Sequence, residues 1–208
     1  MLTIARIILD AIFPPRPETL LVRTLSPERV RALSFPARYH ETYYIYDYQL
    51  PPIRALIHEN KYYKNNTAAR LLARGLQDWL TTRARERSMP ILLVPIPLSR
   101  ARQHERGYNQ VTEVLHALAP LTNVILDKTI LTRTAHTVSQ TSLSRTDRLK
   151  NVSGAFSSEA SVLGMYHNHT IVIVDDVVTT GATLLAARAA LAPHLTKDTH
   201  IILLALAH

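Results

Sequence analysis

Short runs of aliphatic residues alternate with longer amphipathic stretches along the 208-residue chain. The runs at residues 91–94 and 171–174 are continuous and bounded by polar residues, which is typical of strands buried on both faces. Residues 68–87 repeat apolar positions at helical spacing and predict a long helix. The second aliphatic run is followed by an acidic, threonine-rich turn and an alanine-rich helix over residues 184–191. The pattern therefore places a polar loop at the end of a buried strand, where ligands bind in open parallel α/β sheets.

The rest of the pattern predicts smaller elements. Ser26 and Pro27 are typical of the N-cap and first position of a helix, which should end near Leu33. Other helices are predicted over residues 2–12, over residues 53–59, and from Gly107 to about residue 118. Strands are predicted at residues 19–24, 124–126, 130–132 and 152–156, and at residues 200–206, where the last strand closes the sheet.

Length and composition limit the class of protein. The chain is long enough for one domain, or for one domain with a small appendage; we assign residues 1–50 to an N-terminal appendage and residues 51–208 to the main domain. The absence of cysteine excludes disulfides and thiolate metal sites. No apolar run approaches the roughly 20 residues that span a membrane, and Arg6 and Asp10 interrupt the apolar beginning of the chain. We therefore expect no signal peptide, no membrane insertion and a cytoplasmic protein.

The charge of the chain favours anionic partners. A net charge of +8 suits a phosphorylated small molecule, nucleic acid or an anionic surface, although a solvated basic surface is the alternative. Five tyrosines between residues 39 and 48 either stack on nucleic-acid bases or pack within a strand, and packing is the more common role. His167 and His169 have no carboxylate or third histidine at metal-ligand spacing.

The candidate chemistry lies at the end of the second aliphatic run, in the segment Asp175-Asp-Val-Val-Thr-Thr-Gly-Ala-Thr183. Ionised carboxylates only accept hydrogen bonds, so they suit a ligand rich in hydroxyls or a metal ion. Threonine hydroxyls, a glycine and the N–H groups that begin the next helix make an anion site. Carboxylates for ribose hydroxyls beside N–H groups for a phosphate describe a site for a ribose 5-phosphate.

Basic residues follow the first aliphatic run. A proline-constrained loop that begins at Pro95 leads into three arginines: Arg100, Arg102 and Arg106. Guanidinium groups at a strand end suit a polyanion such as pyrophosphate, and a surface loop without a ligand is the alternative. A second polar segment, residues 133–150, carries Arg133, Arg145, Arg148 and Lys150. A polar segment of this length is usually a lid or disordered, and we expect it to become ordered over the bound anion.

These motifs together resemble the ComF family, the competence-protein and GntX-like proteins related to type I phosphoribosyltransferases. Residues 171–184 closely resemble the motif with which type I phosphoribosyltransferases bind phosphoribosyl diphosphate (PRPP). The resemblance also covers residues 10–15, the helix that ends at Lys61-Tyr62, residues 94–98, Arg106-Gly-Tyr-Asn-Gln110, and residues 133–156.

The resemblance implies the type I phosphoribosyltransferase fold, an α/β fold with a mainly parallel central sheet flanked by helices. It implies that Asp175 and Asp176 hold the ribose hydroxyls and Mg2+, the metal directly or through water or those hydroxyls. Arg106, Arg133 and Arg148 would assist catalysis beside the two carboxylates. The implied PRPP-binding residues are Pro97, Leu98, Ser99, Arg100, Asp175, Asp176, Val177, Thr179, Thr180, Gly181, Ala182 and Thr183.

The N-terminal region departs from the family pattern. Members usually carry a four-cysteine zinc ribbon after a Phe-Pro-Pro turn; here Phe13-Pro14-Pro15 is present but no cysteine follows. We therefore expect no bound zinc and a metal-free packing in its place. Tyr108 stands where the family usually has phenylalanine, a mild change.

Two functions remain open. One is the transfer of phosphoribose from PRPP, with Mg2+, to an unidentified acceptor, in a role linked to DNA uptake during natural transformation. The alternative is a non-catalytic protein that responds to PRPP and binds single-stranded DNA through Arg100, Arg102 and Arg106. DNA-uptake proteins are possible partners in both cases, and the sequence leaves the oligomeric state open.

Overall fold

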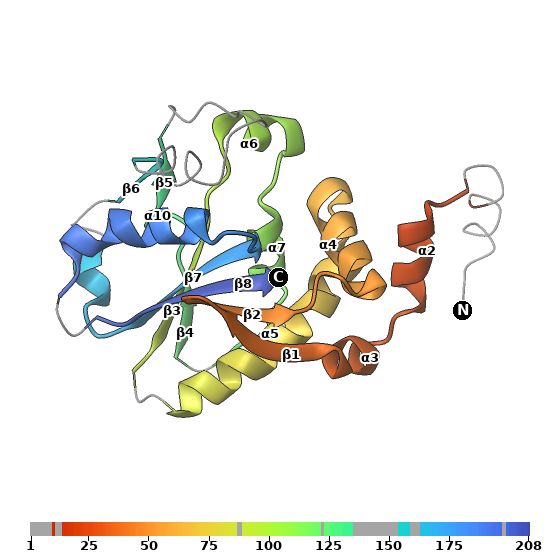
Figure 1. Cartoon of the computed structure of the whole chain (residues 1–208), viewed down its shortest axis with the longest axis horizontal. Coiled ribbons are helices and arrows are strands. Elements are labelled where there is room, and N and C mark those ends of the chain that lie inside the picture. Colours follow the sequence, from red (N-terminus) through yellow and green to blue (C-terminus); the bar gives the residue numbers. More distant parts are fainter. Residues whose placement is uncertain are drawn as a thin grey trace.

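A computed structural model describes residue 10 and residues 14–86, 89–121, 123–134, 154–158, 163–196 and 199–208. Figure 1 shows a twisted central sheet with helices on both sides. In chain order the elements are α2 (Pro17–Thr24), α3 (Pro27–Ala32), β1 (Ser34–Tyr39), β2 (Thr42–Tyr46), α4 (Pro51–Tyr63), α5 (Asn66–Glu86), β3 (Ile91–Pro95), α6 (Arg100–Arg106), α7 (Gln110–His116), β4 (Val124–Leu126), β5 (Thr132–Arg133), β6 (Phe156–Ser157), η1 (Gly164–Tyr166), β7 (Thr170–Val177), α10 (Ala182–Leu191), η2 (Ala192–His194) and β8 (Ile201–Ala207).

The described part of the chain contains a six-stranded sheet in the order β1-β2-β8-β7-β3-β4, and a separate pair, β5-β6. In the six-stranded sheet the neighbours from β2 to β4 are parallel and β1 runs antiparallel to β2, and the separate β5–β6 pair is antiparallel. This arrangement confirms the expected α/β fold with a mainly parallel sheet. The prediction that the last strand closes the sheet is wrong: β8 lies inside it, because its second edge pairs with β2 (Figure 1).

Two cores lie on the two faces of the sheet. Val172 and Val174 of β7 pack with α4, α5 and α7, whereas Ile171 and Ile173 pack with α10. The continuous aliphatic run therefore arises because successive side chains of a strand point to opposite faces and both faces are covered. The same alternation turns Asp175 toward the face of α10 and Asp176 toward the face of α4 and α7.

The N-terminal region contributes to the same sheet. β1 and β2 precede residue 50 and extend the sheet beyond β8, while α2 packs on α4 and α3 packs on α5. The boundary at residue 50 stays a prediction. The strand predicted at residues 19–24 is wrong, because Pro17 begins a helix there, with Glu18 in the first turn and Arg23 in the last. The N-cap role of Ser26 is confirmed by its bond from the Arg29 backbone N–H.

The segment after β3 also differs from the prediction. The arginines expected in a loop lie on α6, which Ser99 caps by accepting from the Arg102 backbone N–H. Gly107 does not begin a helix but ends α6, with a φ of 72° in the left-handed region. The next helix, α7, begins after Asn109, whose side chain accepts two backbone N–H groups. Phe13 and all but residue 10 of the predicted helix over residues 2–12 lie outside the described residues, as do residues 152 and 153. Of the rest of the strand predicted at residues 152–156, only Phe156 is in a strand, β6, which pairs with β5 and not with the six-stranded sheet.

Candidate functional site

Two adjacent carboxylates at the end of β7 have different surroundings. Asp176 is 6% exposed. Its Oδ2 accepts from Nζ of Lys61 at 2.6 Å and from Nε2 of Gln110 at 2.9 Å, and its Oδ1 accepts from the Val177 backbone N–H at 2.8 Å. Asp175 is half-buried, and its Oδ1 accepts from the Asp176 backbone N–H at 2.9 Å. Within the described residues no side chain donates to Asp175. Its carboxylate can therefore accept further hydrogen bonds, whereas both oxygens of Asp176 already accept them.

The two carboxylates also differ in their affinity for protons. Burial, and then the charge of Asp176, raises the pKa of Asp175 to about 7. Burial acts in the same direction on Asp176, but the Lys61 ammonium and the hydrogen bonds from Lys61 and Gln110 hold its pKa below the usual value. Such separated pKa values at a strand end are typical of binding and catalytic sites.

A hydrogen-bond network connects Asp176 to two other segments. Gln110, which donates to Asp176, also accepts from Nη1 of Arg106 at 3.2 Å through its side-chain oxygen. Nδ2 of Asn60 on α4 donates to the Gln110 carbonyl at 2.9 Å, and the Tyr108 hydroxyl donates to the Asn60 carbonyl at 2.8 Å. The network joins three segments that are far apart in the sequence, namely the end of α4, residues 106–110 and the end of β7.

The loop between β7 and α10 leads into a helix N-terminus at the carboxyl edge of the sheet. Gly181 has a φ of 76°, a backbone conformation that glycine adopts at little cost, and the ten-residue helix α10 begins directly after it. The first N–H groups of a helix have no intrahelical acceptor, so they are available to a ligand. The backbone N–H of Ala182 lies 3.4 Å from the Thr180 hydroxyl. The loop threonines are exposed or half-buried: Thr179, Thr180 and Thr183.

The loop after β3 reaches the same edge of the sheet. Pro95 is the register partner of Val174, and the Ile96 backbone N–H donates to the Val174 carbonyl at 2.9 Å. The three residues that follow Ile96 are half-buried beside the end of β7: Pro97, Leu98 and Ser99. The hydroxyl of Ser99 already accepts from the Arg102 backbone N–H at 3.3 Å, so this side chain is the N-cap of α6.

The predicted arginines are placed differently from one another. Arg100 and Arg102 are exposed on α6, while Arg106 is half-buried with its guanidinium 5.1 Å from the centre of the Tyr62 ring. Arg133 on β5 is close enough to Arg102 and Asp175 for their charges to interact. Burial, and then the charge of Arg102, lowers the pKa of Arg133, and Asp175 opposes this shift. Arg148 lies outside the described residues.

The carboxylates fit Mg2+ only in part. The described residues include no group of three histidine, aspartate or glutamate side chains that could hold a metal ion, and Asp176 is engaged by Lys61. Mg2+ in proteins often keeps several waters and uses one or two carboxylates together with substrate phosphates. Asp175 therefore fits a magnesium ion that arrives with a polyphosphate ligand, and the residues form no complete protein cage.

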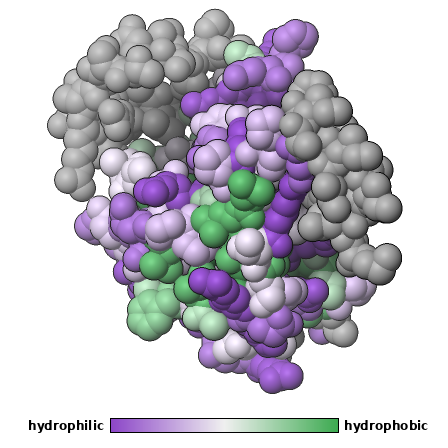
Figure 2. Space-filling model, turned by 90° about the vertical axis from the view of Figure 1, so that its right-hand side faces the viewer, coloured by the Kyte–Doolittle hydropathy of each residue, from purple (hydrophilic) through white to green (hydrophobic). Residues whose placement is uncertain are grey.

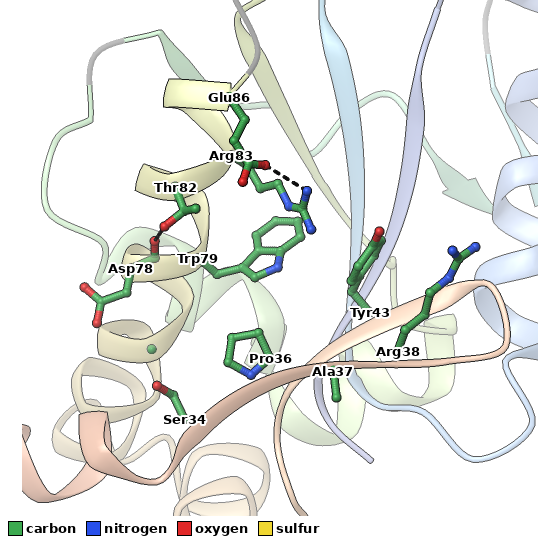
Figure 3. A pocket seen from close by; sticks show the side chains of 11 residues that line it. Ser34, Pro36, Ala37, Arg38, Tyr43, Asp78, Trp79, Thr82, Arg83 and Glu86 are labelled. Atoms are coloured by element: carbon green, nitrogen blue, oxygen red, sulfur yellow. Dashed lines mark hydrogen bonds and ion pairs between the residues drawn. The ribbon is translucent and has the colours of Figure 1, made fainter.

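A cavity of about 520 Å³ lies between α5 and the β1–β2 hairpin (Figure 3). None of the predicted site residues lines it. Several of its charged groups already pair: Arg83 donates to Glu86 at 2.9 Å and lies over the Tyr43 and Trp79 rings, and Asp78 accepts from Arg31. Because the predicted motif residues lie elsewhere, the candidate site is the carboxyl edge of the sheet and not this cavity.

The tyrosines between residues 39 and 48 pack rather than form an open platform. Tyr46 is fully buried and its hydroxyl bonds to α5, and Tyr43 packs on Trp79 with ring centres 5.9 Å apart.

In the residues described, no helix is both long and apolar enough to cross a membrane. Lys61 and Gln110 were not predicted as site residues, because they reach Asp176 from α4 and α7. Their segments do appear in the family resemblance.

Comparisons with known proteins identify the family of the chain. A family model described as "Phosphoribosyl transferase domain" matches residues 104–208, which include α7, β7, the polar loop and α10. The chain is 33% identical over 144 residues to Competence protein F of Haemophilus influenzae, covering 67% of this chain and 62% of that protein. It is 33% identical over 156 residues to DNA utilization protein YhgH of Salmonella typhi and to the protein of that name in Escherichia coli K12, covering 74% of this chain and 66% of each relative. The matched region thus spans somewhat less than two thirds of these relatives' lengths.

Proposed function

Because the chain belongs to the phosphoribosyl transferase domain family and is a homologue of Competence protein F and DNA utilization protein YhgH, we propose that the carboxyl edge of its sheet binds PRPP. The bound phosphoribose would be transferred to an acceptor whose identity is open. The names of the relatives support a role in the uptake or use of DNA.

One observation carries this proposal. The carboxylate of Asp175 and the Gly181 turn that begins α10 occur together at the end of one central strand. The carboxylate accepts hydrogen bonds from ribose hydroxyls, and the N–H groups of the helix N-terminus bind the 5-phosphate. A ribose 5-phosphate presents both groups on one small molecule, and the family resemblance favours it over other sugar phosphates.

The chemistry follows from the charges that such a transfer creates. As the bond from C1 of the ribose to the pyrophosphate breaks, positive charge builds on the ring and the pyrophosphate leaves with the bonding electron pair. Arg133, whose charge interacts with that of Asp175, and Arg102 beside it would stabilise this leaving group. Bound Mg2+ would neutralise part of the pyrophosphate charge. The acceptor would then form the new bond at C1.

Titration calorimetry with PRPP and Mg2+ tests the site, and release of pyrophosphate with a panel of nucleobases tests catalysis. We expect Asp175→Asn to weaken PRPP binding by at least about tenfold, because a charged hydrogen bond is worth roughly 1.5–3 kcal/mol. Asp127→Asn is a matched control: Asp127 follows edge strand β4 and bonds to Thr129 and Tyr166. Unchanged affinity in Asp175→Asn would rule out the assignment.

A second candidate function is the binding of single-stranded DNA, and one surface favours it. On α4, Tyr62 and Tyr63 are 52% and 46% exposed. Arg106 lies over the Tyr62 ring, and Arg16 lies over the Tyr63 ring at 3.2 Å. The side of the molecule that carries α2 and α4 is mostly hydrophilic around a small hydrophobic cluster (Figure 2). Exposed rings beside cations suit stacked bases and phosphates.

Fluorescence anisotropy with a labelled oligonucleotide tests this second candidate. We expect Tyr62→Ala to weaken binding to single-stranded DNA by roughly 1–3 kcal/mol if bases stack there, and binding to fall steeply with added salt. Tyr44→Ala is the control, since Tyr44 is a half-buried tyrosine on β2 whose ring packs against that of His208. DNA binding without any pyrophosphate release would favour this candidate over catalysis.

A further inference from the structure

Lys61 belongs to the strand-end site although it comes from α4, outside the matched residues 104–208. Its ammonium lies 2.6 Å from Oδ2 of Asp176. The Lys61 side chain is 23% exposed, whereas that of Asp176 is 9% exposed. A lysine ammonium has three N–H donors, and the described residues show Asp176 as its one acceptor. Donors therefore remain for a group that arrives from solvent.

Asp176 has little left to offer a ligand. Its two oxygens already accept from Lys61, Gln110 and the Val177 backbone, and its side chain is nearly inaccessible. At the position where the motif suggests a second acceptor for ribose hydroxyls, the partly exposed side chain of Lys61 therefore lies against a nearly inaccessible carboxylate. The site is then one carboxylate, Asp175, beside one ammonium.

We propose that Lys61 is a ligand-binding residue of this site and donates a hydrogen bond to a hydroxyl oxygen of the ribose while Asp175 accepts from the neighbouring hydroxyl. This assignment rests on the proposed function. A vicinal diol suits the arrangement because each hydroxyl both donates and accepts. The positive charge of Lys61 also offsets the two adjacent carboxylates, which otherwise repel a phosphorylated ligand.

Binding of ribose 5-phosphate in the presence of EDTA tests the proposal without pyrophosphate or a divalent cation. Calorimetry should show that wild-type protein binds ribose 5-phosphate more tightly than 2-deoxyribose 5-phosphate. Lys61→Gln should lose about tenfold in affinity for ribose 5-phosphate, because it loses a charged hydrogen bond. It should also discriminate less between the two sugars. Lys61→Arg, which keeps a charged donor, should retain most of the affinity.

Two further variants separate ligand binding from a purely structural role. Lys61→Gln leaves Asp176 buried without its cation, and this can harm folding. The double variant Lys61→Gln, Asp176→Asn removes both charges together. If Lys61 only neutralises Asp176, the double variant regains wild-type affinity and the proposal is overturned; if Lys61 contacts the sugar, affinity stays low in a folded protein. Lys64→Gln is the control, since Lys64 follows α4 and its ammonium lies over the Tyr108 ring.

The outcomes also separate this proposal from the proposed function. If wild-type protein binds neither PRPP with Mg2+ nor ribose 5-phosphate, the proposed function fails and the Lys61 assignment fails with it. If wild-type protein binds either ligand and folded Lys61→Gln binds it equally well, the Lys61 assignment is wrong and the proposed function stands. Loss of affinity in Lys61→Gln and in the double variant, with Lys64→Gln unchanged, supports both.

Discussion

Gly75 determines how closely α5 approaches the N-terminal hairpin. Its backbone N–H donates to the Tyr46 hydroxyl at 2.9 Å, and this hydroxyl donates in turn to the Leu72 carbonyl at 3.0 Å. A Cβ atom on Gly75 would lie 2.5 Å from the Tyr46 hydroxyl oxygen and 2.8 Å from Cβ of Ser34. The tyrosine can enter the core with its hydroxyl satisfied because no side chain occupies this position on the helix.

We expect Gly75→Ala to destabilise the protein by roughly 1–3 kcal/mol, because the added methyl group overfills a packed contact. This outweighs the helix propensity gained, which is at most about 1 kcal/mol. Urea unfolding measures the change. Gly164→Ala is the control, since a Cβ there meets nothing within 4 Å. Equal midpoints for the two variants would contradict the close contact.

The end of α4 depends on a tyrosine from another segment. The Tyr108 hydroxyl accepts from the Lys64 backbone N–H at 2.8 Å and donates to the Asn60 carbonyl. Lys64 is in the left-handed region, with a φ of 47°, so the helix ends there. Burial raises the pKa of Tyr108, and the hydroxyl stays protonated and able to donate. Tyr108 replaces a phenylalanine that is usual in the family, and the sequence suggested that this change is mild. Its added hydroxyl nevertheless caps α4, the helix that carries Lys61.

We expect Tyr108→Phe to lower stability by about 1–2 kcal/mol, because a carbonyl and an N–H group lose their partner. Amide hydrogen exchange should become faster at the end of α4, and ligand affinity should fall as Lys61 becomes less well positioned. Tyr44→Phe is the matched control, because among the described residues its hydroxyl has no hydrogen bond. Unchanged exchange at Lys64 in Tyr108→Phe would argue against the cap.

The elements that the sequence predicted well are those with strong local patterns. The aliphatic runs became β3 and β7, and the Asp175 to Thr183 segment became a strand end, loop and helix start as expected. The prediction failed where local preference is ambiguous: Thr19 to Thr24 contains residues that suit either state, and Pro17 decides for a helix. Gly107 suits both a helix start and a helix end. The role of Lys61 could not be predicted, because its ion pair with Asp176 forms only when two distant segments meet.

The N-terminal region is attached to the rest of the molecule through Glu59 of α4, which is 1% exposed. Its carboxylate accepts from Arg16 at 2.9 Å, from Thr19 at 3.0 Å and from Asn65 at 2.9 Å. Burial alone would raise the pKa of Glu59, but the hydrogen bonds from Asn65, Arg16 and Thr19 lower it below the usual value. One buried carboxylate therefore joins α2, α4 and the beginning of α5.

We expect Glu59→Gln to lower stability at pH 7 by roughly 1–3 kcal/mol, because a charged acceptor with three donors is lost. Since the folded pKa of Glu59 lies below the unfolded value of about 4.3, its contribution is present above that value and is lost as the pH falls through the folded pKa. The difference between wild type and variant should therefore shrink below about pH 4. Urea midpoints at neutral and acidic pH measure this difference. Glu86→Gln is the control, because Glu86 is exposed and pairs with Arg83 at the surface, where an ion pair contributes little.

We also expect the stability of the whole molecule to be independent of zinc. The chain has no cysteine, and the described N-terminal helices attach through Glu59 and through packing on α4 and α5. A zinc-selective chelator should leave the melting temperature unchanged. A large drop in melting temperature on addition of the chelator would show that a metal stabilises the N-terminal region after all.

The position of β8 between β7 and β2 has a consequence for biosynthesis. Thr42 pairs with Leu203, so the hairpin is made early on the ribosome but meets its neighbour only after β8 has been translated. Until then, the backbone N–H and C=O groups of β2 and β7 that pair with β8 lack partners, and unpaired strand edges promote association between nascent chains. Closure of the sheet is a late, long-range event, and such events are slow. Co-expression of molecular chaperones that shield strand edges should therefore raise the yield of folded protein, even though the chain is only 208 residues long.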